Sequence, residues 1–383
     1  MEGMPVTPIN RFHPIGFDRA KLAATLRREG MRAVLLSSPE NVYYTTGYTA
    51  LPSAGNPILY MLRNRLPFFS LVEDTGRVTL LCWDFSAWNM DFGVDEIVGY
   101  ADLAGALAAV RDLVGAKVGA AERLGVESSL PYNILQVVAP LVSSDRLVVA
   151  DRALDTVRLI KTPAEIACLQ RGVDIIEKTC GELFDILRVG MGRNELTHEA
   201  KKRLIANGAD GISHLTFSFA LANPEFDIDE VLEPGKLVTL DLGAIYRGYC
   251  SDNRRYALAG PVPAHIGDLY KRMVGIVDGV GEAMTPGTSY QALMDLARSL
   301  YAREKVEPLP RFNHVGHNIG LETEERWIDD DPHAVIETGM VINIELYSHA
   351  STGEQIGNEE SYIIEETGPR RISRLPREIR AIA

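Results

Sequence analysis

Residues 236–258, KLVTLDLGAIYRGYCSDNRRYAL, form two apolar, strand-like runs joined by a tight turn, and each run carries one aspartate. A two-residue turn at Tyr246 and Arg247 places Asp241 directly opposite Asp252, with Cβ atoms about 5 Å apart. Two like charges so close together in an apolar hairpin are unfavourable unless a cation lies between them. The hairpin therefore predicts a metal site in an antiparallel sheet.

Three more metal-type ligands follow in apolar or glycine-flanked stretches. Glu345 lies in MVINIELY and Glu359 begins the returning arm of a second expected hairpin, while His317 lies in HVGHNIGL. Oxygen ligands with a single imidazole favour Mn²⁺, Co²⁺, Fe²⁺ or Zn²⁺. Bridging carboxylates can hold two such ions about 3.5–4 Å apart, and a water between them loses a proton near neutral pH. The set predicts a two-metal hydrolytic centre.

The composition narrows the class of protein. The 383 residues are 46% hydrophobic and carry a net charge of −13, which disfavours nucleic acid or an anionic membrane as a partner. No apolar run is long enough to span a membrane, and the N-terminal residues lack a signal pattern. Four cysteines without CxxC spacing indicate reduced thiols, so we expect a cytoplasmic protein.

Two domains are expected. Residues 17–151 alternate helix-like and strand-like runs, which predicts an α/β N-terminal domain with a parallel or mixed sheet. A boundary follows in DRALDTVRLIKTPAEI, where Thr162 can cap a long helix with Glu165 at the capping-box position. Helices followed by hairpins then predict an α+β C-terminal domain.

The same motifs resemble the prolidase, aminopeptidase P and creatinase family. VTLDLGAIYRGYCSDNRR, HVGHNIGLE, GMVINIE and NEESYIIEETG are similar to its ligand motifs, and VRLIKTPAEIACLQRG is similar to its interdomain junction. The resemblance covers nearly the whole chain. It implies a creatinase-like N-terminal domain over residues 1–157 and a pita-bread metal-binding catalytic domain over residues 158–383.

The resemblance also implies roles for the five ligands. Asp241 would bind one ion, often through both oxygens, while Asp252 and Glu359 would bridge two ions. His317 would bind the second ion, and Glu345 would bind it or act as general base toward the bridging water. The implied protein is a homodimeric aminopeptidase P-like or prolidase-like hydrolase with two divalent ions, Mn, Co, Zn or Fe. It would cleave an amide or related C–N bond of a small or peptide-like substrate.

The sequence departs from the peptidase pattern in four ways. Glu324 stands where the peptidases carry a histidine seven residues after the ligand histidine, and Gly357 replaces an arginine two residues before the bridging glutamate. A histidine usually found shortly before the first aspartate is missing from ALANPEFDIDEV. Leu346 and Tyr347 replace the Pro-Gly that often follows the first glutamate.

Three residues are candidates for the rebuilt substrate shell. Glu324 could shuttle protons if it is buried, or it could be a solvated residue of an acidic run. His349 could replace a missing histidine, or be an ordinary loop residue. His314 precedes His317 by three residues and would face the other side of a strand.

Two alternatives remain open at the level of the sequence. The first is a relative resembling the dimethylsulfoniopropionate lyases, in which the metal acts as a Lewis acid for elimination. The missing histidines motivate it, although those lyases carry a further acidic residue where Thr239 or Gly243 stands here. The second is a binding protein that keeps the fold without turnover, against which the five ligands argue.

Overall fold

The computed structural model describes residues 10–219, 225–226, 228–310 and 312–382. The chain divides into two compact units, Met1–Arg158 and Leu159–Ala383. Half of the stretch ALANPEFDIDEV, from which the family's histidine is missing, lies outside the described residues, because 220–224 and 227 are not among them. None of the helices in the described ranges is both long enough and apolar enough to cross a membrane.

The N-terminal unit is built on a six-stranded mixed sheet with the strand order β6-β4-β3-β2-β7-β8. Its elements are β1 (Asn10–Arg11), α1 (Arg19–Arg28), β2 (Met31–Leu36), α2 (Pro39–Thr46), α3 (Ile58–Met61), β3 (Phe69–Glu73), β4 (Val78–Trp83), α4 (Asp84–Ala87), β5 (Met90–Asp91), β6 (Glu96–Tyr100), α5 (Leu103–Lys117), β7 (Arg123–Val126), α6 (Tyr132–Val138), two 3-10 turns (Ala139–Leu141 and Ser144–Arg146), β8 (Leu147–Val149) and α7 (Asp151–Arg158). Helix α5 contacts β4 and β6, while α1 contacts β2 and β3. The expected α/β unit with a mixed sheet is confirmed.

The C-terminal unit is α+β, as expected. Its elements are α8 (Pro163–Ile186), α9 (Arg193–Ala206), β9 (Gly211–Phe219), β10 (Leu237–Tyr246), β11 (Tyr249–Cys250), β12 (Asn253–Ala259), α10 (Ala264–Glu282), α11 (Tyr290–Glu304), β13 (Gly316–Asn318), β14 (Arg326–Trp327), a 3-10 turn (Ile328–Asp330), β15 (Val341–His349), β16 (Gln355–Glu365), β17 (Gly368–Arg371) and β18 (Arg380–Ile382). The predicted capping box of α8 is present: Thr162 and Glu165 each bond the other's backbone N–H.

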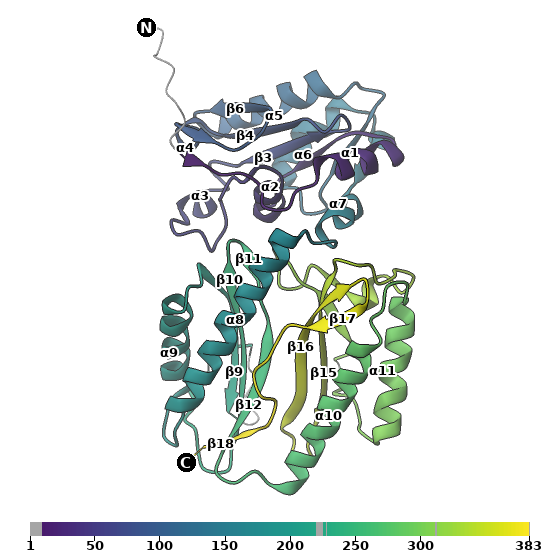
Figure 1. Ribbon diagram of the computed structural model, residues 1–383. Helices are drawn as coiled ribbons and strands as arrows, with labels where there is room; N and C mark the ends of the chain where they lie inside the picture. The colour runs from purple at the N-terminus through teal and green to yellow at the C-terminus, as the bar shows by residue number, and fades with distance from the viewer. Residues whose placement is uncertain (1–9, 220–224, 227, 311, 383) are drawn as a thin grey trace. The chain divides into compact units, whose positions relative to one another are not determined.

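One sheet runs through the whole C-terminal unit, in the order β11-β10-β12-β16-β15-β13-β14, with β9 pairing with β10, β17 with β16 and β18 with β12. Long helices lie along it: α8 and α9 lie beside β10 and β9, α10 lies beside β15 and β16, and α11 lies beside α10 (Figure 1). Each pair of helices closes one apolar core against the sheet.

Strand alternation then decides which face carries the polar residues. Leu240 and Leu242 point into the core beneath α8 and α9, while Ile344 and Leu346 point into the core beneath α10 and α11. Successive side chains of a strand point to opposite faces. The residues between these leucines and isoleucines therefore lie on the face that the helices do not cover.

Candidate metal centre

Four charged residues form a row across the middle of this open face. Asp241 of β10 is paired with Arg254 of β12, Arg254 with Glu359 of β16, and Glu359 with Glu345 of β15. All four residues are at most 8% exposed. The row concentrates three carboxylates around one guanidinium in a setting where unpaired charge is costly. We call these four residues, with Asp252, His214 and His317, the floor.

The register of the first hairpin differs from the predicted one. The turn lies one residue later, at Arg247 and Gly248, which both have positive φ (52° and 85°). Such a pair is typical of the two-residue turns that match strand twist. Asp241 therefore faces Arg254, not Asp252. Because this register differs by two residues from the expected one, both aspartates still lie on the same face, and they approach each other diagonally.

The imidazole of His317 lies close to the carboxylates of Asp252, Glu345 and Glu359. Its Nε2 is 4.0 Å from Asp252 Oδ2, 3.8 Å from Glu345 Oε1 and 3.9 Å from Glu359 Oε1. Its Nδ1 is 3.3 Å from the carbonyl oxygen of Asn318, which fixes the ring orientation. His317, Asp252 and Glu359 form one of the groups in the described part of the chain whose donor atoms lie close enough to hold a metal ion.

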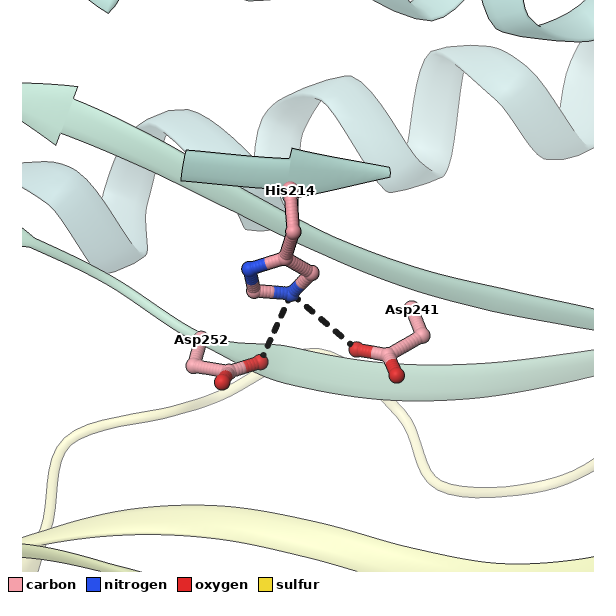
Figure 2. Close-up of side chains that lie close together, drawn as sticks. All are labelled: His214, Asp241 and Asp252. Carbon is pink, nitrogen blue, oxygen red and sulfur yellow. Dashed lines mark hydrogen bonds and ion pairs between the residues drawn. The ribbon is translucent and has the colours of Figure 1, made fainter. Parts of the chain in front are cut away.

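A second such group involves a histidine that the sequence analysis did not select. His214 of β9 places Nε2 3.3 Å from Asp241 Oδ1 and 3.1 Å from Asp252 Oδ1, as Figure 2 shows. It lies 27 residues before Asp241 in the chain, but β9 and β10 are neighbouring strands. The signal in the sequence that could have identified His214 is its position in a strand-like run that precedes the strand carrying Asp241.

Electrostatics indicate that this centre needs a cation. Burial raises the pKa of Glu345, and burial together with Asp252 raises the pKa of Glu359 well above its ordinary range. Burial alone would lower the pKa of His214, but the carboxylates of Asp252 and Asp241 outweigh it and raise that pKa. Asp252 Oδ1 is buried and accepts no hydrogen bond from the described residues. A buried orphan oxygen among carboxylates fits a divalent ion.

Arg254 is the one cation in the row, and its guanidinium contacts Asp241 and Tyr347. Its Nε is 3.1 Å from Asp241 Oδ2, to which its Nη2 also donates, and its guanidinium lies 4.2 Å from the centre of the Tyr347 ring. Burial acts to raise the pKa of Asp241, but Arg254 and His214 together outweigh it and lower that pKa to about 2. The structure thus places a guanidinium beside the pocket from β12.

Tyr347 explains the glycine at the position of the family's arginine. The two residues Tyr347 and Gly357 are direct partners on β15 and β16. A Cβ atom at Gly357 would overlap the Tyr347 ring and the carbonyl of Leu346. The Tyr347 hydroxyl donates to Glu345 Oε2 at 2.6 Å. The tyrosine therefore fills the space above Gly357 and orients Glu345.

The floor residues other than His317 line a pocket of about 780 Å³. One side of the pocket is made by three aromatic residues of the segment 309–327, Phe312, His314 and Trp327, which we call the wall. His314 stacks on Trp327 with ring centres 4.0 Å apart, and Phe312 packs 5.4 Å from His314. Trp327 in turn contacts His317 at 5.1 Å. The wall is therefore continuous with the floor.

A buried ion pair supports the wall from behind. Lys161 Nζ lies 2.5 Å from Glu325 Oε2, and both side chains are almost fully buried. Glu325 Oε1 also accepts the backbone N–H of Leu321 at 3.0 Å, within the loop that joins β13 to β14. The N–H of Lys161 donates to the carbonyl of Gly339. Lys161 thus connects the loop below Trp327 to the chain just before β15.

The remaining predicted site residues differ in position. His314 lies in the pocket, where its Nδ1 contacts Asp329 at 2.9 Å. Glu324 also lines the pocket but is exposed, so it lacks the burial on which the proton-shuttle hypothesis depends. His349 is exposed at the end of β15, and the lining found in the described residues does not include it.

Comparison with known proteins agrees with the architecture. Residues 167–367, a little over half of the chain, match metallopeptidase family M24. The chain therefore belongs to metallopeptidase family M24, a class of metal-dependent hydrolases. Residues 19–160 match the creatinase/prolidase N-terminal domain, so the resemblance to the prolidase and creatinase group is confirmed.

Curated relatives align over nearly their whole length. A Xaa-Pro dipeptidase of Pyrococcus horikoshii is 25% identical over 368 residues, covering 94% of this chain and 97% of the relative. An uncharacterized peptidase of Bacillus subtilis is 27% identical and covers 94% and 98%. These matches to peptidases favour neither the lyase alternative nor a binding protein without turnover.

Solved structures share the fold at lower identity. A prolidase from Thermococcus sibiricus superposes with a TM-score of 0.82 at 19% identity, covering 95% of this chain and 98% of that one. A dipeptidase from Pyrococcus horikoshii gives a TM-score of 0.81 at 20% identity, with coverage of 95% and 100%. The two-unit architecture, with a creatinase-like domain before a pita-bread domain, is therefore that of prolidases.

Proposed function

We propose that the chain is a two-metal hydrolase that cleaves the amide bond of short peptides, with Xaa-Pro dipeptides as the first substrates to test. The observation that carries this proposal is the position of Asp252. Its Oδ1 lies beside His214 and Asp241, and its Oδ2 lies beside His317. A carboxylate with donor groups on both sides is suited to bridge two ions.

Asp241, Asp252, His317, Glu345 and Glu359 would hold the ions. When bound, divalent ions would act as Lewis acids on the scissile carbonyl and lower the pKa of an attacking water toward neutrality. Their donor set of carboxylates and imidazole suits Mn²⁺, Co²⁺, Fe²⁺ or Zn²⁺. The raised pKa values of Glu345 and Glu359 indicate how strongly the buried carboxylates need this compensation.

Glu345 is the residue best suited to move a proton. It lies at the bottom of the pocket, its pKa is raised by burial, and Tyr347 donates to Oε2 so that Oε1 faces His317 and the pocket. A carboxylate with a raised pKa can accept a proton from the attacking water and return it to the leaving amine. Tyr347 acts as a positioning residue for it.

The substrate class rests on the relatives and on the pocket. A Xaa-Pro dipeptidase is among the proteins similar along almost the full chain. The aromatic wall offers a flat apolar surface for a small ring, and Arg254 offers positive charge for a carboxylate. His314 and Glu324, which line the pocket, are candidates to contact the substrate. His349 is a weaker candidate because it lies outside that lining.

The test uses the full chain, stripped of metal with a chelator and reconstituted with Mn²⁺, Co²⁺ or Zn²⁺. Turnover of Ala-Pro, compared with Ala-Ala and an N-acyl amide, is expected to return with metal and to be fastest for Ala-Pro. Asp252→Asn should abolish it, whereas Asp295→Asn, a change at an exposed aspartate of α11, should not. Turnover that survives both the chelator and Asp252→Asn would contradict the proposal.

Three further expectations belong to this proposal. The function of residues 1–157 as a separate creatinase-like domain and the homodimer remain predictions. A cytoplasmic location is supported by the four cysteines, which are all free and buried.

A further inference from the structure

We propose that His214 is a sixth metal ligand, so that each of the two ions is bound by one imidazole. The inference rests on the proposed two-metal function and goes beyond the five ligands that the sequence indicates. It assigns His214 to the ion that Asp241 and Asp252 bind, and His317 to the other ion.

Distances are the first argument. Donor atoms bound about 2.1 Å from one ion lie about 3.0 Å apart at a right angle and about 3.4 Å apart at a tetrahedral angle. The separations from His214 Nε2 to the carboxylate oxygens of Asp252 and Asp241 are 3.1 and 3.3 Å. They are shorter than those from His317 to its carboxylates. Both separations from Nε2 match those of ligands around one ion, and the three donor atoms all lie within 4.8 Å of one another.

Proton counting is the second argument. Nε2 of an imidazole carries at most one hydrogen, yet two carboxylate oxygens lie next to it (Figure 2). A hydrogen directed at Asp241 Oδ1 leaves Asp252 Oδ1 without a donor, and that oxygen accepts no hydrogen bond from the described residues. A cation at this point binds all three atoms at once, which a shared hydrogen cannot do.

The orientation of the ring follows the same pattern as in His317. The Nδ1 of His214 lies 3.0 Å from Ser213 Oγ, and the Nδ1 of His317 lies 3.3 Å from the carbonyl of Asn318. If each Nδ1 donates to its oxygen partner, each Nε2 presents a lone pair to the carboxylates. Metal-bound histidines are oriented in this way by the hydrogen bond of the other ring nitrogen.

The local backbone makes room for the imidazole. His214 is the direct partner of Gly243, and the ladder between β9 and β10 is irregular immediately beyond this pair. A Cβ atom at position 243 would lie 2.6 Å from Cε1 of His214. It would also overlap Ser213 Oγ and the carbonyl oxygen of Ser251, so the close approach of these groups to β10 requires glycine. Bulges of this kind redirect side chains next to functional sites.

Arg254 gives the extra ligand a purpose. Because Arg254 occupies Oδ2 of Asp241, this carboxylate has only Oδ1 left for the ion. The imidazole of His214 would supply the second donor that Asp241 would provide if it bound the ion through both oxygens. Nitrogen in both coordination shells shifts the preference toward Zn²⁺, Co²⁺ or Fe²⁺ and away from Mg²⁺.

The experiment compares the metal-free full chain with His214→Ala, using Zn²⁺ as the probe. Calorimetric titration should give two sites in the wild type and, in the variant, a loss of at least about 10–100-fold in affinity at one of them. X-ray absorption of the zinc-loaded proteins should find about one imidazole per ion in the wild type and about half as many in the variant. His314→Ala, at a histidine of the wall bonded to Asp329, is the matched control and should change neither measurement.

The proposal is overturned if His214→Ala binds two ions with unchanged affinity and an unchanged imidazole count. That result would leave His214 as an ion-pair partner of the two aspartates. His214→Gln keeps the size of the side chain, and the same two measurements apply to it if the alanine variant does not fold. Binding of fewer than two ions by the wild type would instead contradict the proposed function, so the two failures are distinguishable.

Discussion

The floor and the wall of the pocket are held in different ways. The floor residues of β10, β12, β16 and β15 are consecutive cross-strand partners in one sheet, so the hydrogen bonds of the sheet determine their spacing. Phe312 and His314 lie outside helices and strands, and stacking with Trp327 positions them. The ladder suits a centre whose ligands must keep their geometry. The stacked wall can change by single substitutions without disturbing that ladder, so we expect the floor to determine the chemistry and the wall to determine the substrate.

After the loss of turnover expected for Asp252→Asn, the largest expected effect is that of Glu345→Gln. The amide keeps the size of the side chain but cannot accept the proton, so kcat should fall by about 10²–10⁴-fold. KM should change far less, and the Tyr347 hydroxyl keeps a partner. Steady-state kinetics on the metal-loaded protein measure the effect. If KM rises in the variant while kcat is kept, Glu345 acts in substrate binding, as expected of the wall, and not in proton transfer.

Arg254→Met tests the cation of the floor. It removes the guanidinium partner of the buried Asp241 carboxylate, so the metal-free protein should lose about 3–5 kcal/mol of stability. The metal-loaded protein should lose less, because the ion compensates Asp241. Urea denaturation with and without Zn²⁺ measures both values. Arg370→Met, which removes an exposed pair with Glu365, is the control and should cost at most about 1 kcal/mol. If the metal-free and the metal-loaded protein lose equal stability, the ion does not compensate the charge of Asp241.

The stabilisation by metal should increase with pH. The folded-state pKa values of Glu345 and Glu359 are raised, so the stability that these carboxyls contribute is present below their ordinary pKa near 4.5 and is lost as pH rises through the raised values. Metal binding requires the ionised carboxylates and therefore releases these protons. For each proton released, the free energy of metal binding becomes more favourable by about 1.4 kcal/mol per pH unit. The rise in Tm on adding Zn²⁺ should be greater at about pH 7 than at about pH 5.5. A rise that is independent of pH would contradict this coupling.

Trp327→Leu should have the smallest effect of these changes. It removes stacking on His314 and an edge contact to His317, which is worth about 0.5–1.5 kcal/mol. We expect kcat/KM for dipeptides to fall about 2–10-fold, with unchanged zinc stoichiometry. His349→Ala, at an exposed residue outside the lining, should stay within about 0.5 kcal/mol of the wild type. A loss of zinc from Trp327→Leu would show that the wall and the floor are not separable.

Local signals in the sequence predicted most of the fold. The cap of α8 at Thr162 and the alternation along β10 and β15 depend on neighbours in the chain, and these predictions are confirmed. The hairpin register was wrong because the choice between two adjacent turn positions depends on the positive φ of Arg247, which composition does not reveal. The error moved Asp252 by two residues and so kept it on the correct face.

The sequence could not predict the contacts that depend on pairing between distant strands. His214 was missed because an irregular ladder and the absence of a side chain at Gly243 bring it to Asp241, and neither is a local property of β9. Arg254 was missed because its role depends on the position of Tyr347 across two strands. The sequence identified the expected ligands, whereas the residues that contact them could be identified only from the pairing of the strands in three dimensions.

The buried pair between Lys161 and Glu325 has a practical consequence for dissecting this enzyme. Lys161 precedes the first helix of the catalytic unit, yet its ammonium neutralises a carboxylate directly beneath the loop that leads to Trp327. A truncated catalytic unit that begins at Pro163 would keep every proposed metal ligand but would remove the Lys161 ammonium from the buried carboxylate of Glu325. Any minimal enzyme made from this chain therefore has to start upstream of Lys161.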